Sequence, residues 1–179
     1  MKRLLDTFNV LDEQGYIPFS LQANVKQNLK FNPRPYQIKA IARFHHYFTD
    51  YQNRPTPSHL FFHMATGSGK TLVMAANILQ LYEKGYRKFV FVTNLKNTID
   101  KTKENFLNNS LENQKYLFAD SININGQAIE INEVDNFSRI SEADINIHFT
   151  SIQALQLKMQ NPTEDGLSED DFENNDIGI

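Results

Sequence analysis

The chain of 179 residues contains no cysteine and no tryptophan, and has only seven glycines and six prolines. The lack of cysteine excludes a disulfide framework and any metal site built from thiolates. No run of apolar residues is long enough to span a bilayer, and the residues from Met1 to Asp6 lack the apolar stretch of a secretory signal. We therefore expect a cytoplasmic protein with no membrane partner.

Charge is distributed unevenly along the chain. The net charge is −3, but residues 162–179 hold seven acidic side chains and no lysine or arginine, which leaves 18 basic and 14 acidic residues in the rest. A mildly basic body is compatible with a nucleic-acid partner and equally with an ordinary solvated surface. Charge alone therefore does not decide the function.

The hydrophobic pattern predicts one α/β domain with a partly parallel sheet and an inserted β-hairpin. Helical spacing of apolar residues predicts helices over residues 1–14, 20–29, 36–51, 71–82, 95–107 and 151–159. Short apolar runs predict buried strands at residues 59–64, which include His63 as a core residue, at 88–93 and at 145–150, with another strand beginning at 177–179. Alternation around Asn125-Gly126 predicts the hairpin over residues 121–131. The acidic segment after Pro162 is typical of a loop.

A loop rich in glycine, Ala65 to Thr71, lies between the first predicted strand and a predicted helix. Gly67 and Gly69 allow the backbone N–H groups of Thr66 to Gly69, Ser68 included, to turn inward around anionic oxygens, and the helix N-terminus adds positive charge. Lys70 is placed to neutralise phosphates, and the Thr71 hydroxyl to hold Mg²⁺. The strict phosphate-loop pattern would have a glycine at Met64, so this position departs from it. The alternative is a structural glycine loop without a ligand.

The segment Met64 to Thr71 resembles motif I of superfamily 2 helicases and translocases, and Arg34-Pro35-Tyr36-Gln37 is similar to their upstream glutamine motif. The Gln37 amide offers a donor and an acceptor that suit the N6/N7 edge of adenine. The resemblance therefore implies ATP as the nucleotide. The alternative is that Gln37 only belongs to a solvated helix start.

Two further pairs follow predicted strands. Thr93 and Asn94 lie where this superfamily has motif Ia, and Thr150 with Ser151 resembles motif Ib. Hydroxyls at the carboxyl ends of parallel strands suit contacts with a nucleic-acid backbone. Threonine and serine are also common helix N-caps, so capping is the alternative at each position.

Within the superfamily, the chain most resembles the restriction subunit of type III restriction endonucleases and related restriction helicases. The resemblance rests on the Arg34 to Gln37 opening, the phosphate loop and the hairpin before motif Ib. It implies a RecA-like motor domain over residues 31–179, preceded by a helical extension over residues 1–30. It also implies a helicase or translocase that uses ATP and Mg²⁺, acts on DNA and works with a methyltransferase subunit. No nuclease motif is visible.

The acidic pair that activates water in this superfamily is not presented by a strand here, because polar residues precede Asp170-Asp171. We therefore expect an incomplete motor domain from a longer protein, inactive on its own. Two other functions stay open on the sequence. One is an RNA helicase, and the other is a nucleotide-binding module that uses ATP as a switch without a nucleic-acid track.

Overall fold

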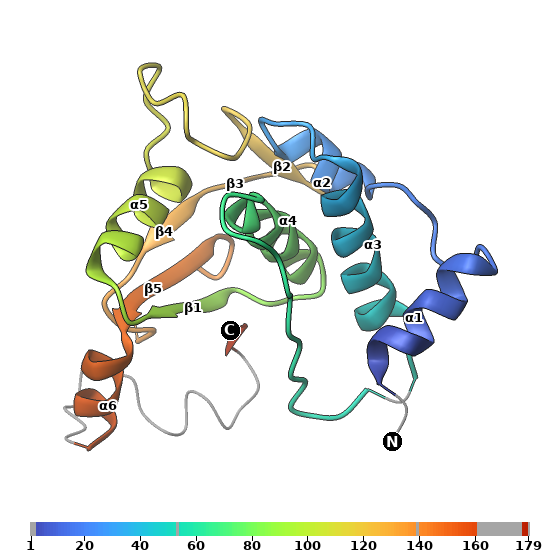
Figure 1. The fold of residues 1–179 in the computed structure, drawn as a ribbon. Helices are drawn as coiled ribbons and strands as arrows, with labels where there is room; N and C mark the ends of the chain where they lie inside the picture. The colour runs from blue at the N-terminus through green and yellow to red at the C-terminus, as the bar shows by residue number, and fades with distance from the viewer. Residues whose placement is uncertain (1–2, 53, 139, 161–176, 179) are drawn as a thin grey trace.

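A computed structural model describes residues 3–52, 54–138, 140–160 and 177–178 (Figure 1). Its helices are α1 (Leu4–Glu13), α2 (Ala23–Asn28), α3 (Pro35–Thr49), α4 (Lys70–Glu83), α5 (Lys96–Leu107) and α6 (Ile152–Gln160). Its strands are β1 (Lys88–Thr93), β2 (Ile122–Ile124), β3 (Gln127–Ile129), β4 (Ile131–Glu133), β5 (Ile145–Ser151) and β6 (Ile177–Gly178). The α/β fold expected from the sequence is confirmed.

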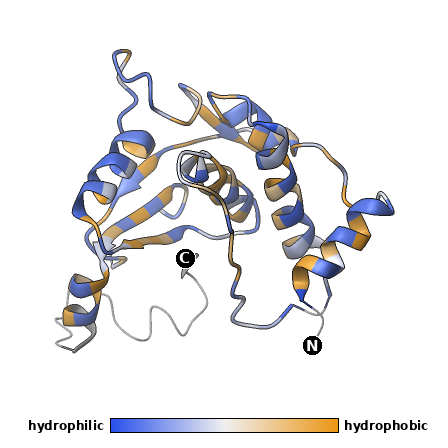
Figure 2. Ribbon diagram, in the orientation of Figure 1, coloured by the Kyte–Doolittle hydropathy of each residue, from blue (hydrophilic) through white to orange (hydrophobic). Residues whose placement is uncertain are grey.

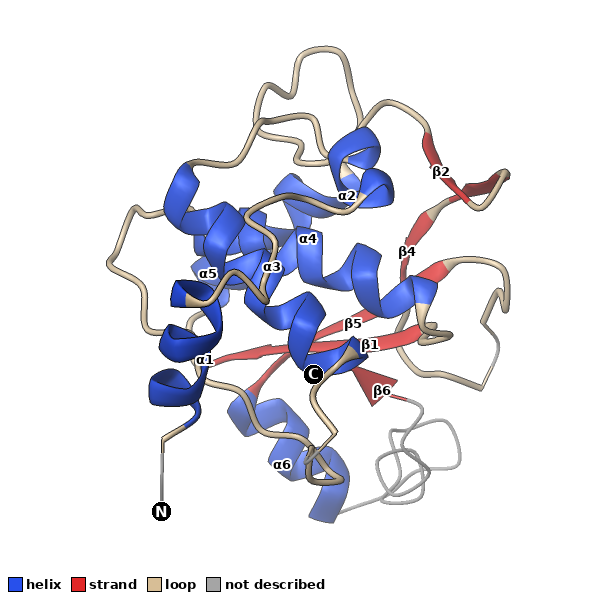
Figure 3. Cartoon of the chain, turned by 90° about the vertical axis from the view of Figure 1, so that its right-hand side faces the viewer, coloured by secondary structure: helices blue, strands red, loops and turns tan. Residues whose placement is uncertain are grey.

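The main sheet has four strands in the order β4-β5-β1-β6, and every neighbouring pair runs parallel. β1 and β5 form its centre and pair from Lys88 opposite Asn146 to Thr93 opposite Ser151. Helices α4 and α5 lie on one face of the sheet and α6 lies toward the other (Figures 1 and 3). Parallel pairing brings the carboxyl ends of β1 and β5 to one edge, the usual ligand side of such sheets.

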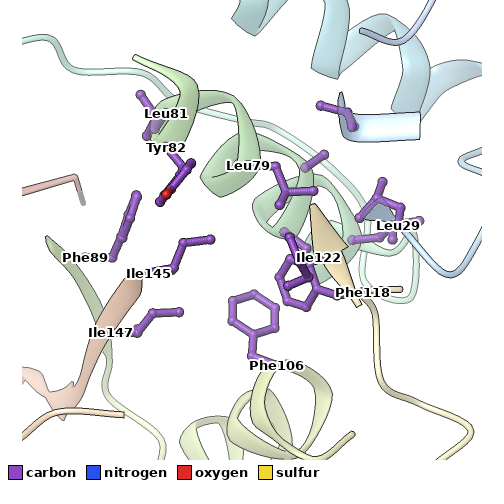
Figure 4. Packing of buried hydrophobic residues seen from close by; sticks show 14 of the residues in the cluster. Leu29, Leu79, Leu81, Tyr82, Phe89, Phe106, Phe118, Ile122, Ile145 and Ile147 are labelled. Carbon is purple, nitrogen blue, oxygen red and sulfur yellow. The ribbon is translucent and has the colours of Figure 1, made fainter. Parts of the chain in front are cut away.

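The main hydrophobic core lies between the sheet and α4. Nine of the fourteen residues of α4 are buried, so this helix is covered on nearly all sides. Leu79 from α4, Phe106 from α5, Phe118 and Ile147 from β5 pack together in this core (Figure 4). Helix α5, by contrast, is largely hydrophilic (Figure 2). Packing therefore fixes α4, whose first residue follows the glycine-rich loop.

The predicted hairpin is confirmed. β2 and β3 pair antiparallel around Asn125 and Gly126, whose φ angles of 54° and 81° are the two positive values that a type I′ turn requires. The buried Asn28 side chain ties the hairpin to α2. It accepts a hydrogen bond from the Asn123 N–H (2.8 Å) and donates one to the Asn123 carbonyl (2.9 Å). The insertion is therefore part of the packed domain.

The expectation of a buried strand at residues 59–64 is wrong. The side chains of this segment alternate between core and solvent, as in a strand, but the segment joins no sheet in the part of the chain that the structure describes. The half-buried residues are Leu60, Phe62 and Met64, and the exposed ones are His59, Phe61 and His63. The apolar run predicted one buried face, but a strand also needs a neighbour for its backbone hydrogen bonds. His63, expected in the core, instead stacks on exposed Phe61.

Other boundaries differ by a few residues. The second helix begins at Ala23 and not at Ser20, because Gln22 still has an extended backbone. The sequence pattern does not reveal β4, since its three residues follow the hairpin directly. The strand expected to begin at residue 177 is present as β6. The acidic segment after Pro162, expected to be a loop, lies outside the described residues.

Candidate nucleotide-binding site

The glycine-rich loop turns sharply just before α4. Gly67 and Gly69 have φ angles of 76° and 78°, in the left-handed region that glycine adopts without strain. Ser68 tightens the turn, because its N–H (3.2 Å) and its hydroxyl (2.6 Å) both donate to the Ala65 carbonyl. Gly69 is the N-cap of α4. The loop therefore delivers the chain to the positive end of a buried helix.

Backbone donors remain free where this loop meets the helix. The N–H groups of Gly69, Lys70 and Thr71 have no hydrogen-bond partner among the residues that the structure describes. The first turn of α4 also carries no acidic side chain. Unpaired N–H groups at a helix N-terminus attract anions, and phosphate groups in particular. The geometry suits a phosphate cradle.

Lys70 and Thr71 add side chains to this cradle. The Lys70 ammonium group donates to the carbonyls of Met64 (3.1 Å) and Ala65 (2.9 Å), so it folds back over the loop. A lysine ammonium has three donors, and one remains for another acceptor. The Thr71 hydroxyl forms no hydrogen bond within the described residues and offers one oxygen ligand. One such ligand suits Mg²⁺, which keeps several waters and takes phosphate oxygens.

Met64, where the strict phosphate-loop pattern has glycine, has a structural explanation. Its side chain is half-buried and packs against the main core. Its carbonyl still accepts the Lys70 ammonium. Met64 therefore anchors the start of the loop, and the turn at Gly67 and Gly69 is unaffected.

Gln37, which the sequence analysis assigns to adenine recognition, lies beside this loop, and its amide hydrogen-bonds to the backbone. The side chain is buried, its Oε1 accepts the Arg34 N–H (2.7 Å), and its Nε2 donates to the Ser68 carbonyl (2.9 Å). Nε2 also lies 3.4 Å from the Gly69 carbonyl oxygen. The glutamine thus connects the start of α3 with the phosphate loop.

Tyr36 also contacts the loop, and the sequence analysis did not predict this contact. Its hydroxyl donates to the same Ser68 carbonyl, at 2.9 Å. The only feature of the sequence that could have indicated this hydrogen bond is the position of Tyr36 next to Gln37. Two adjacent side chains of α3 therefore hold one peptide group of the loop.

The four residues predicted to contact nucleic acid lie together at the carboxyl edge of the sheet. Thr93 pairs with Ser151 and is followed by exposed Asn94. Thr150 is buried, 5% exposed, and the Ser151 Oγ accepts the Ala154 N–H (3.1 Å) as a helix cap. No hydrogen bond or ion pair joins this group to the phosphate loop in the described ranges. Asn94 is thus its most accessible member.

The parallel sheet and the glycine loop before a buried helix define an α/β domain of the phosphate-loop class. A family model described as "Type III restriction enzyme, res subunit" matches residues 30–175. The chain belongs to this family. The resemblance predicted from Arg34 to Gln37 and the phosphate loop is confirmed.

A curated relative supports the same assignment. The chain is 43% identical over 145 residues to a Haemophilus influenzae protein described as "Probable type III restriction-modification enzyme HindVIP Res subunit". The match covers 76% of this chain and 27% of the relative, so the chain spans about a quarter of the relative's length. No solved structure matches the chain. Among the described helices, none is both long enough and apolar enough to cross a membrane.

Proposed function

We propose that this chain is the N-terminal ATP-binding part of an ATP-dependent DNA helicase or translocase, the restriction subunit of a type III restriction-modification system. The observation that carries the proposal is the loop before α4, with two positive-φ glycines, three N–H groups that no described residue accepts, and Lys70. Family membership supports the same reading. Residues 31–179 would form the first part of a RecA-like motor domain, with residues 1–30 as a helical extension.

The proposal gives each loop residue a role. The backbone from Thr66 to Gly69 would hold the β- and γ-phosphates of ATP, and Lys70 would neutralise their charge. The Thr71 hydroxyl would be one ligand of a Mg²⁺ ion, and that ion would supply positive charge to stabilise the phosphoryl group during its transfer. In this scheme Lys70 and Thr71 are the catalytic residues of this segment.

DNA and a methyltransferase subunit are the partners we propose, and the cytoplasm is the location. The relative is named as the Res subunit of a type III restriction-modification enzyme, and this name supports both partners. Accessible Asn94, next to Thr93 and Ser151 at the carboxyl edge, is suited to contact a nucleic-acid backbone. Thr150 would take part only through the strand that carries it, because its side chain is buried.

Gln37→Ala tests adenine recognition in the full-length protein. One lone pair of Oε1 remains free beside its bond to the Arg34 N–H. If this amide reads adenine, its loss should lower ATP affinity by about 1–3 kcal/mol, with a smaller effect on GTP. Equilibrium binding of ATP and GTP measures the difference. Equal losses for the two nucleotides would show that Gln37 acts on the loop alone.

Asn94→Ala tests the nucleic-acid contact. Because backbone contacts carry no sequence information, the substitution should weaken duplex DNA binding by a similar factor on unrelated sequences. Gel retardation of two DNA duplexes of unrelated sequence by the full-length protein measures the change in affinity. Gln114→Ala is the control, because Gln114 is also exposed. The N-cap of α5 is Leu95 and not Asn94, so stability should not change. Unchanged DNA affinity would remove this edge from the interface.

The same retardation assay tests the proposed track. The full-length protein should bind duplex DNA, and so slow its migration, more strongly than duplex RNA. Preference for RNA would favour an RNA helicase. If the protein binds neither nucleic acid but still binds ATP, a nucleotide-dependent switch is favoured.

A further inference from the structure

The Ser68 carbonyl of the phosphate loop accepts two hydrogen bonds from one turn of α3. The Tyr36 hydroxyl and the Gln37 amide nitrogen each lie 2.9 Å from this oxygen. A carbonyl oxygen has two lone pairs, so it can accept both donors. Helix α3 begins at Pro35, whose fixed φ suits the first position of a helix. Both donors therefore come from a well-defined helix start.

These bonds determine where the loop N–H groups point. A trans peptide unit is planar, so its C=O and the following N–H point in opposite directions. The Ser68 carbonyl points toward α3, and the Gly69 N–H of the same unit must point away from it. That N–H is among the donors left unpaired in the described part of the chain. Gln37 Nε2 lies near the Gly69 carbonyl as well, on the unit that carries the Lys70 N–H.

We propose that Tyr36 is a positioning residue of the phosphate loop, which together with Gln37 orients the loop N–H groups toward the phosphate chain of any nucleoside triphosphate. The inference rests on the proposed nucleotide site and adds a determinant that is independent of the base. The hydroxyl touches the Ser68 carbonyl and acts through the loop.

The expected effect is moderate, because Gln37 still holds the carbonyl when the tyrosine hydroxyl is lost. A single hydrogen bond contributes modestly to stability in water. Tyr36→Phe keeps the ring and removes only this donor. We expect it to lower affinity for the phosphate chain by about threefold to tenfold. Tyr36→Phe combined with Gln37→Ala should cost more than the two single effects together, because either donor alone can orient the peptide.

The test compares three ligands with Mg²⁺ on the full-length protein: ATP, GTP and inorganic tripolyphosphate, which has no base. Tyr36→Phe should lower the affinity for all three by the same factor. The matched control is Tyr16→Phe, since Tyr16 is 66% exposed and its hydroxyl has no hydrogen bond within the described residues. Thermal unfolding should be unchanged in Tyr16→Phe and only slightly earlier in Tyr36→Phe, which loses one hydrogen bond. Both variants should be fully folded at the temperature of the binding assay, so the loss of affinity is not a loss of folding.

Lys70→Ala separates this inference from the proposed function. If Lys70→Ala removes binding of all three ligands and Tyr36→Phe changes none, the positioning role is overturned and the nucleotide site stands. A loss confined to ATP in Tyr36→Phe would place the tyrosine at the base and also overturn it. If Lys70→Ala leaves all three affinities unchanged, the nucleotide site itself is wrong, and the role of Tyr36 falls with it.

Discussion

Gly69→Ala is expected to lower nucleotide affinity by roughly 100-fold or more, about 3 kcal/mol, in the full-length protein. Two costs combine at this position. Gly69 has a φ of 78°, which costs a residue with a side chain about 1–2 kcal/mol. A β-carbon there would also overlap the Gln37 Nε2 and displace the amide from the Ser68 carbonyl.

Gly67→Ala is the matched control for this substitution. Its φ of 76° imposes a similar backbone strain, but a β-carbon there has no neighbour within 4 Å. Gly67→Ala should therefore show the strain alone and lose clearly less affinity than Gly69→Ala. Calorimetric titration of both variants with Mg-ATP measures the two costs. Equal losses would mean that the contact with Gln37 adds nothing.

Lys70→Ala is expected to reduce ATP turnover by the full-length protein at least about 10²–10³-fold, because one preorganised donor to developing charge is removed. The Lys70 ammonium already lies against the loop, bonded to the Met64 and Ala65 carbonyls. Phosphate release under saturating Mg-ATP measures the effect.

Lys26→Ala is the control for the lost charge, since Lys26 is an exposed lysine of α2. It should turn over ATP at the rate of the unaltered protein. Turnover that survives Lys70→Ala would assign the phosphate-binding role to a different residue.

Local signals predicted much of this fold. Asn125-Gly126 predicted the hairpin because few dipeptides accept two positive φ angles. Helical spacing predicted α3 and α4 because each buries one or more faces. The segment 59–64 could not be settled in this way. Its alternation shows which side chains face the core, but strand pairing depends on segments distant in sequence.

In the candidate site too, local features could be predicted from the sequence, and contacts between distant segments could not. The spacing of Gly67, Gly69 and Lys70 predicted the loop, because phosphate binding requires that backbone and that charge at fixed positions. The glutamine motif identified Gln37 as a candidate site residue, and the fold places it beside the loop. The hydrogen bond from Tyr36 did not, because tyrosine at a helix start has many ordinary uses. Only the fold brings its hydroxyl to the Ser68 carbonyl.

The role proposed for the loop from Ala65 to Thr71 is to bind the ATP that drives a motor on DNA. The most direct measurement is phosphate release by the full-length protein with Mg-ATP, alone, with duplex DNA and with duplex RNA. We expect duplex DNA to stimulate phosphate release and Lys70→Ala to remove the stimulated rate. Release that is absent under all three conditions, or that is indifferent to duplex DNA, would contradict the proposed role.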